Sequence, residues 1–138
     1  MSKVITRTVQ AQLVNQAPAP LRPLAAALRY ETADPLAVEF VFPPEVSLDG
    51  AEVTWAFSRE LLTEGLRGSA GEGDIHVRPC GQQRTVIEFY AEGDVAVLEF
   101  RTAELALFLQ YTYDMVPAGS EMALLDLEQG LTELLRSM

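Results

Sequence analysis

Hydrophobic and polar residues alternate along several stretches of this chain before Arg101, which is the pattern of half-buried β-strands. The alternation predicts strands over residues 5–14, 36–42 and 53–57. Residues 24–31 fit a further strand, or a turn of helix leading into one. Side chains two positions apart lie on the same face of a strand, so one face of each is expected to meet the core. The expected inner-face residues are Ile5, Val9, Ala11, Leu13, Leu36, Val38, Phe40, Phe42, Val53, Trp55 and Phe57.

Three more strands are predicted over residues 74–78, 85–90 and 95–100. Residues that favour turns separate the strands, and they are Asp34-Pro35, Asp49-Gly50, Gly81 and Glu92-Gly93-Asp94. The proline-rich stretch Ala17–Pro23 cannot join the interior of a sheet and predicts a connection. We therefore expect a mostly antiparallel sheet of about seven strands.

Two helices are predicted after the fourth strand and after the last one. Ser58 can cap a short helix from Arg59 to Leu66, and Gly65 or Gly68 can end that helix in a left-handed conformation. The glycine-rich residues 68–73 then read as a connection. Thr102 is expected to cap a longer helix that reaches Val116. Apolar residues nearly encircle this longer helix, which predicts burial on more than one side.

A third helix closes the chain. Asp126 with Gln129 resembles a capping box that would begin it. Leucines at spacings of three and four form an apolar seam, which either packs on the sheet or forms part of a subunit interface. The seam residues proposed for an oligomer interface are Leu127, Leu131 and Leu134. The predicted fold is a single α+β domain over residues 1–138.

The charge balance restricts the class of partner. The net charge is −10, with Lys3 the only lysine against 20 carboxylates. Nucleic acid and anionic membrane surfaces both require a basic face, so neither is an expected partner. No stretch is long and apolar enough for a membrane span or a secretory signal, and the single cysteine, Cys80, fits a reducing compartment. We expect a cytoplasmic protein that binds another protein.

Residues that could carry catalysis are scattered. His76 and Cys80 lie four positions apart on one strand, about 13 Å from each other, too far for a nucleophile–base pair. His76 is expected at the surface or in an interface. The glycines of residues 65–73 follow a helix and lead into a strand, the reverse of a phosphate-binding loop. We therefore predict no enzyme activity, no metal and no cofactor.

Three segments resemble the SsgA-like family of actinomycete sporulation and cell division proteins. They are Leu28–Val38 (LRYETADPLAV), Trp55–Leu66 (W-x-F-x-R-x-L-L-x-E-G-L) and Gly71–Pro79 (G-x-G-D-I-x-V-x-P). Val116–Gly119 and Asp126–Gln129 resemble the C-terminal third of the same family. The similarity covers nearly the whole chain. The chain departs from the usual pattern of the family at Glu31, Leu36 and Cys80. The different side chain at Leu36 would change the surface there and alter contacts with a partner.

The resemblance implies a role that composition does not reveal. Members of the family act in sporulation-specific septation without catalysis, and we expect this chain to be of the SsgB type. That type is implied to help position the tubulin-like protein FtsZ at septum sites, together with an SsgA-type paralogue. A homo-oligomer, with a trimer favoured, is also implied. The family fold is similar to the whirly type of single-stranded nucleic-acid-binding proteins.

Two functional readings follow. The first is a non-enzymatic division protein that docks its partner on the helix Arg59–Leu66, through Arg59, Glu60 and Glu64. The alternative is a single-stranded nucleic-acid-binding module of whirly-like fold, against which the net charge of −10 argues.

Overall fold

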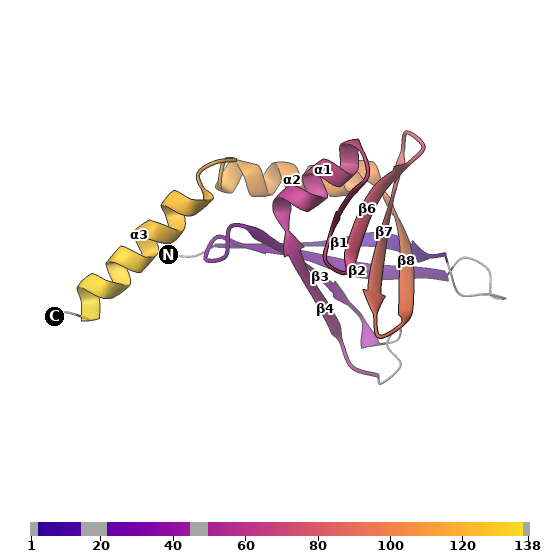
Figure 1. Cartoon of the computed structure of the whole chain (residues 1–138), viewed down its shortest axis with the longest axis horizontal. Helices are drawn as coiled ribbons and strands as arrows, with labels where there is room; N and C mark the ends of the chain where they lie inside the picture. Colours follow the sequence, from indigo (N-terminus) through magenta and orange to yellow (C-terminus); the bar gives the residue numbers. More distant parts are fainter. Residues whose placement is uncertain (1–2, 15–21, 45–49, 137–138) are drawn as a thin grey trace.

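The computed structural model describes residues 3–14, 22–44 and 50–136. Within these residues, eight strands form one antiparallel sheet in the order β4-β3-β2-β1-β8-β7-β6-β5, and three α-helices accompany it (Figure 1). The predicted α+β class with a mostly antiparallel sheet is confirmed. The elements are β1 Val4–Leu13, β2 Arg22–Glu31, β3 Ala37–Phe42, β4 Val53–Ser58, α1 Arg59–Arg67, β5 Ala70–Glu72, β6 Ile75–Cys80, β7 Arg84–Ala91, β8 Asp94–Arg101, α2 Thr102–Met115 and α3 Glu121–Arg136.

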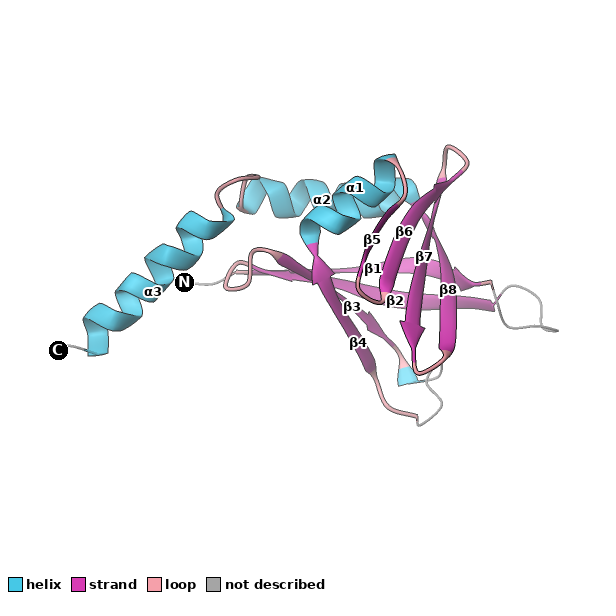
Figure 2. Cartoon of the chain, in the orientation of Figure 1, coloured by secondary structure: helices cyan, strands magenta, loops and turns pink. Residues whose placement is uncertain are grey.

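The connection through α1 forces the sheet to curl. The two edge strands of the sheet, β4 and β5, are joined directly by the nine-residue helix α1. A nine-residue helix is only about 14 Å long, whereas the edges of a flat eight-stranded sheet would lie about 34 Å apart, at roughly 4.8 Å per strand. The sheet therefore bends until its edges approach, and α1 closes the gap between them (Figure 2).

Aromatic side chains fill the inside of the curl. The ring of Phe89 on β7 lies 5.4 Å from that of Phe42, 6.2 Å from that of Phe40 and 5.3 Å from that of Trp55, measured between ring centroids. Such separations suit tilted and edge-to-face contacts, which add to the free energy of burying the rings. The two halves of the sheet thus share one core, in which Val38, Phe40 and Phe42 are buried as the alternation predicted.

Leu36 is the exception on that face. Its side chain is 43% exposed, so its predicted place on the inner face is wrong. The strand β3 begins only at Ala37, and Leu36 still belongs to the preceding turn. The carbonyl of Leu36 accepts a hydrogen bond from the backbone N–H of Arg59, which ties this turn to the start of α1.

The prediction that α2 is buried on more than one side is also wrong, because α2 is buried on one side only. Leu105, Phe108 and Leu109 face the sheet and α1, whereas Leu107 is 52% exposed. In the described part of the chain no further layer covers the outer side of α2. Helix apolarity alone could not show which of its faces would find a partner.

Several predicted element ends also differ from the structure. The glycine-rich connection contains the short strand β5, which pairs with β6 around a turn where Gly73 has a positive φ of 58°. The helix α1 continues through Gly65 and ends before Gly68, whose φ of −169° is extended and not left-handed. Ser58 caps α1 as predicted, because its side chain accepts a hydrogen bond from the N–H of Leu61.

The later helices begin at unexpected positions. Thr102 is the first residue of α2 and not its cap, since its hydroxyl instead bonds that of Thr85 on β7 at 2.8 Å. The helix α3 begins at Glu121, so the predicted capping box at Asp126 and Gln129 falls inside the helix. The turn between the two helices begins at Pro117, and α3 starts directly after it at Glu121, five residues before the predicted start at Asp126.

Gly65 provides a test of how closely α1 packs on the sheet. A Cβ atom at this position would lie 2.3 Å from the Cβ and Cγ1 atoms of Val77 on β6. We expect Gly65→Ala to lower the free energy of unfolding by about 1–3 kcal/mol through overpacking, despite the higher helix propensity of alanine. Thermal unfolding followed by circular dichroism measures the change.

The matched control is Gly130→Ala in α3. Among the described residues, and apart from its chain neighbours and the backbone of its own helix, no atom lies within 4 Å of a Cβ built at Gly130, so no clash opposes the gain in helix propensity. The control variant should show equal or higher stability. Equal stability of Gly65→Ala and the wild type would contradict the close approach of α1 to β6.

Candidate docking surface

The helix α1 presents two carboxylates to solvent. Glu60 and Glu64 are exposed and lie one helical turn apart, while Leu61 and Leu62 on the other side are buried in the core. The exposure expected of Glu60 and Glu64 is thus observed. Their role in docking a partner stays a prediction.

A third carboxylate is held next to the start of α1. The hydroxyl of Ser58 donates a hydrogen bond to Oε2 of Glu72 on β5 at 2.9 Å. The hydroxyl oxygen of Ser58 also accepts a hydrogen bond from the N–H of Leu61 at 3.0 Å. The cap of α1 is therefore also a link between the strand that precedes the helix and the strand that follows it. The exposed outer side of α1 and β5 has a net acidic character, which favours a basic or donor-rich partner surface.

Arg59 does not belong to this surface, so the prediction that it is an exposed docking residue is wrong. Its side chain is only 1% exposed. One terminal nitrogen, Nη1, donates to the carbonyls of Thr112 (3.1 Å) and Val116 (2.8 Å) at the end of α2. The other, Nη2, donates to Oε2 of Glu121 at 2.8 Å, and Glu121 is the first residue of α3.

Two tyrosines enclose the guanidinium. Its carbon lies 4.1 Å from the ring centroid of Tyr113 and 5.2 Å from that of Tyr30, distances suited to cation–π attraction. Both rings are anchored by their hydroxyls. Tyr113 shares a hydrogen bond of 2.6 Å with the hydroxyl of Thr63, and Tyr30 donates to the carbonyl of Pro35 at 3.0 Å. Burial raises the pKa of Tyr30 above its ordinary value, so this hydroxyl stays a donor at neutral pH.

The sequence contained a signal for this burial. Arg59 shares one side of α1 with Leu62 and Leu66, which lie three and seven positions further on. A charged residue in an apolar row is buried only when acceptors are available. The acceptors for Arg59 come from residues more than fifty positions away, which helical spacing does not reveal.

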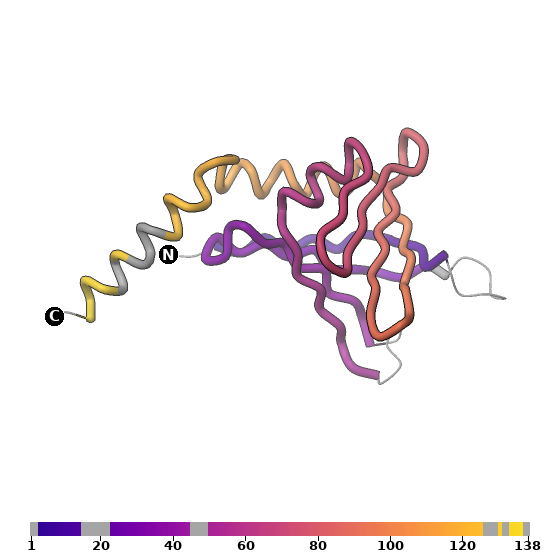
Figure 3. Tube along the Cα trace, in the orientation of Figure 1, coloured from indigo at the N-terminus to yellow at the C-terminus, as the bar shows by residue number. Residues whose placement is uncertain are grey.

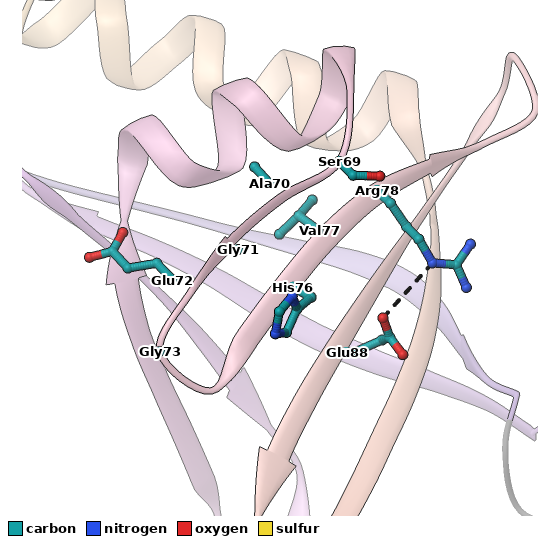
Figure 4. Close-up of a pocket in the computed structure, with 9 residues that line it drawn as sticks. All are labelled: Ser69, Ala70, Gly71, Glu72, Gly73, His76, Val77, Arg78 and Glu88. Carbon is teal, nitrogen blue, oxygen red and sulfur yellow. Dashed lines mark ion pairs between the residues drawn. The ribbon is translucent and has the colours of Figure 1, made fainter.

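An open depression of about 450 Å³ lies over the hairpin of β5 and β6 (Figure 4). His76 rests above Gly71, and its ring meets that of Tyr90 edge-on at 5.4 Å. Nε of Arg78 lies 3.9 Å from Oε1 of Glu88 across the two strands. These side chains are exposed or half-buried, and His76 is at the surface as predicted. Among the residues that the structure describes, no group of His, Cys, Asp and Glu side chains is placed to hold a metal ion.

A second surface lies on α3, which leads away from the sheet (Figure 3). Leu134 is 60% exposed, so the alternative that the leucine seam packs on the sheet is wrong at this position. Leu135 and Met122 are exposed as well. The side chains of Leu127 and Leu131 lie outside the described residues. The interface alternative for the seam therefore stays a prediction.

The curled sheet, the acidic outer side of α1 and the projecting helix α3 with its exposed apolar residues define a small α+β protein with two external helical surfaces. None of the helices in the described ranges is both long and apolar enough to cross a membrane. A family model described as "Streptomyces sporulation and cell division protein, SsgA" matches residues 24–121. The chain therefore belongs to the SsgA family, as the motifs indicated.

Individual relatives agree with this assignment. The sporulation-specific cell division protein SsgB of Frankia casuarinae is 38% identical over 136 residues, which cover 95% of this chain and 91% of the relative. The SsgB protein of Streptomyces coelicolor is 41% identical over 118 residues, which cover 82% of each chain. These relatives show that the chain is of the SsgB type.

Solved structures share the fold. An SsgA-like sporulation-specific cell division protein from Thermobifida fusca superposes with a TM-score of 0.84 at 34% identity, covering 96% of both chains. A structure from work on SsgB mutations and longitudinal cell division in sporulating Streptomyces coelicolor gives a TM-score of 0.78 at 32% identity, covering 90% of this chain and 97% of the other.

The ion pair between Arg59 and Glu121 should make stability depend on pH. Hydrogen bonds from Arg59 and from the backbone N–H groups of Glu121 and Gly119 lower the pKa of the Glu121 carboxyl below its ordinary value of 4.5. A carboxyl whose pKa is lower in the folded state contributes stability above pH 4.5, and that contribution is lost as the pH falls through the folded-state value. The phenol of Tyr30, which also faces Arg59, titrates far above this window, because burial raises its pKa above the ordinary value.

We therefore expect Glu121→Gln to be less stable than the wild type at pH 7 and to approach it as the pH falls well below 4.5. Urea unfolding at a series of pH values measures the difference. Glu133→Gln, which removes an exposed carboxylate from the same helix, should show a small difference that varies little with pH. A Glu121→Gln difference that stays constant between pH 7 and pH 3 would rule out the stabilising ion pair.

Proposed function

We propose that this chain is a non-enzymatic protein of sporulation septation that helps to recruit or position FtsZ at septum sites in the cytoplasm, together with an SsgA-type paralogue. The observation that carries the proposal is the identity of 38% over 95% of this chain with a protein named for sporulation-specific cell division. The family resemblance implies FtsZ as the partner. The exposed helical surfaces supply places where such contacts can form.

The acidic side of α1 is the proposed contact with the partner. Glu60, Glu64 and Glu72 project from α1 and from the adjoining strand β5. Exposed charges of this kind steer association and select partners with complementary potential more than they add affinity. A single contact of this size is weak, so recruitment of a polymer requires several copies that act together.

The exposed apolar residues of α3 supply a way to assemble those copies. Leu134, Leu135 and Met122 expose large apolar side chains on one projecting helix. Soluble proteins bury such groups when a partner surface is available. We propose that α3 contributes to a homo-oligomer, with a trimer favoured by the family resemblance. The oligomer would present several α1 surfaces to one filament.

Co-sedimentation with purified FtsZ filaments tests the recruiting role. Glu60→Lys with Glu64→Lys should weaken binding by at least about tenfold, since reversed charges replace attraction by repulsion. The control pair, Glu52→Lys with Glu92→Lys, makes the same change of net charge at exposed sites. Glu92 lies in the turn between β7 and β8, at the opposite end of the sheet from α1 (Figure 1).

The control pair should bind FtsZ as the wild type does. Circular dichroism should confirm that all variants keep the fold, because neither Glu60 nor Glu64 is buried. Equal weakening by both pairs would assign the effect to net charge alone. Absence of the wild-type protein from the pellet would reject direct recruitment of FtsZ.

The oligomer has a separate test. Leu134→Glu with Leu135→Glu places charges in the proposed interface and should reduce the solution mass to that of a monomer. Light scattering coupled to size-exclusion chromatography measures this mass. Glu133→Gln with Arg136→Gln, which alters exposed polar residues of the same turn, should leave the mass unchanged. An unchanged mass in the leucine variant would exclude this part of α3 from the interface.

A further inference from the structure

The direction of α3 depends on a short junction. The helix α2 ends at Met115, and Pro117–Ser120 connects it to α3, which leaves the body at a steep angle to α2 (Figure 1). Gly119 in this junction has a φ of 90°, a conformation that side chains rarely allow. Backbone hydrogen bonds from Ser120 to Pro117 and from Leu124 to Ser120 shape the turn itself. They connect the turn only to its own neighbours and not to the sheet.

One side chain from α1 contacts both ends of this junction. Arg59 donates to the carbonyl of Val116, the C-cap residue just after α2, and to the carboxylate of Glu121, the residue that begins α3. The second oxygen of Glu121 accepts a bond of 2.7 Å from the N–H of Gly119, so the carboxylate is fixed on both sides. Because Arg59 is buried and enclosed by two tyrosines, its guanidinium has little freedom to move with the carboxylate of Glu121 if α3 changes direction.

We propose that Arg59 acts as a clamp that sets the direction in which α3 leaves the body. The guanidinium contacts the carbonyls of Thr112 and Val116 and the first residue of α3 at once, and its N–H groups form a rigid fork that fixes their relative directions. The surfaces on α1 and α3 are thereby held at a fixed angle to each other.

Half-buried Leu124 is a further contact near the junction, and it packs against the core. Such an apolar contact is not directional and tolerates sliding and rotation of the helix. The hydrogen-bonded clamp, in contrast, is satisfied at only one orientation of Glu121. Loss of the clamp should therefore leave the helix attached and let its direction vary.

Distance measurements between two spin labels test the clamp. The exposed Cys80 on β6 takes one label, and Arg136→Cys at the end of α3 takes the other. Doubly labelled protein is diluted into an excess of unlabelled chain, so that only distances within one chain are recorded. The clamped chain should give a narrow distance distribution by pulsed electron paramagnetic resonance.

Arg59→Met, which keeps most of the buried volume but has no donors, should broaden this distribution at least about twofold, because local order follows from local contacts. Glu121→Gln should broaden it less, since the amide still accepts a hydrogen bond. Arg59→Lys should not restore the narrow distribution, because one ammonium lacks the fork geometry. Glu133→Gln should match the unchanged chain.

A distribution that stays narrow in both Arg59→Met and Glu121→Gln would overturn the proposal, as would an unchanged chain that is already as broad as the variants. Circular dichroism and the fluorescence of Trp55 check that the body stays folded. If Arg59→Met does not fold, Glu121→Gln decides the question, because Glu121 is 17% exposed and its loss leaves no cavity in the core.

Discussion

The buried guanidinium of Arg59 is the interaction on which the arrangement of the helices depends. Removing a positive charge from water costs several kcal/mol unless acceptors and a counter-charge replace the water. Here the acceptors are carbonyls at the end of α2 and the carboxylate of Glu121 at the start of α3, and two tyrosine rings cover the remainder. These contacts join all three helices through one side chain. The clamp thus contributes specificity as much as stability.

The clamp works because the sheet brings α1 to the end of α2. The short helix α1 joins the two edge strands of one sheet, and the aromatic cluster around Phe89 holds the resulting curl. The segment Trp55–Leu66, which identified the family, is therefore mainly scaffold. Trp55 reaches the aromatic cluster, Ser58 caps the helix and bonds β5, and Arg59 clamps the helices. The charged residues of α1 that remain exposed to solvent are Glu60, Glu64 and Arg67.

The exposed residues of the helices form two separate external surfaces. One surface is acidic and lies on a helix fixed to the body. The other lies on α3, which projects from the body and exposes large apolar side chains next to charged ones. In the proposed role, the apolar helix assembles the copies and the acidic helix meets the filament. The angle between the two helices decides whether several copies can contact one filament together, which is the condition for avidity.

The sequence by itself determined the features that arise from neighbouring residues. Alternation placed Val38, Phe40 and Phe42 in the core, and the cap at Ser58 began α1, because strand periodicity and capping act over a few positions. Helical spacing likewise predicted that the side chain of Glu60 is exposed. The tertiary structure alone decided that Leu36 stays in a turn, that β5 forms and that Arg59 is buried. Each of these outcomes depends on partners supplied by another element, and only folding brings those partners within hydrogen-bonding distance.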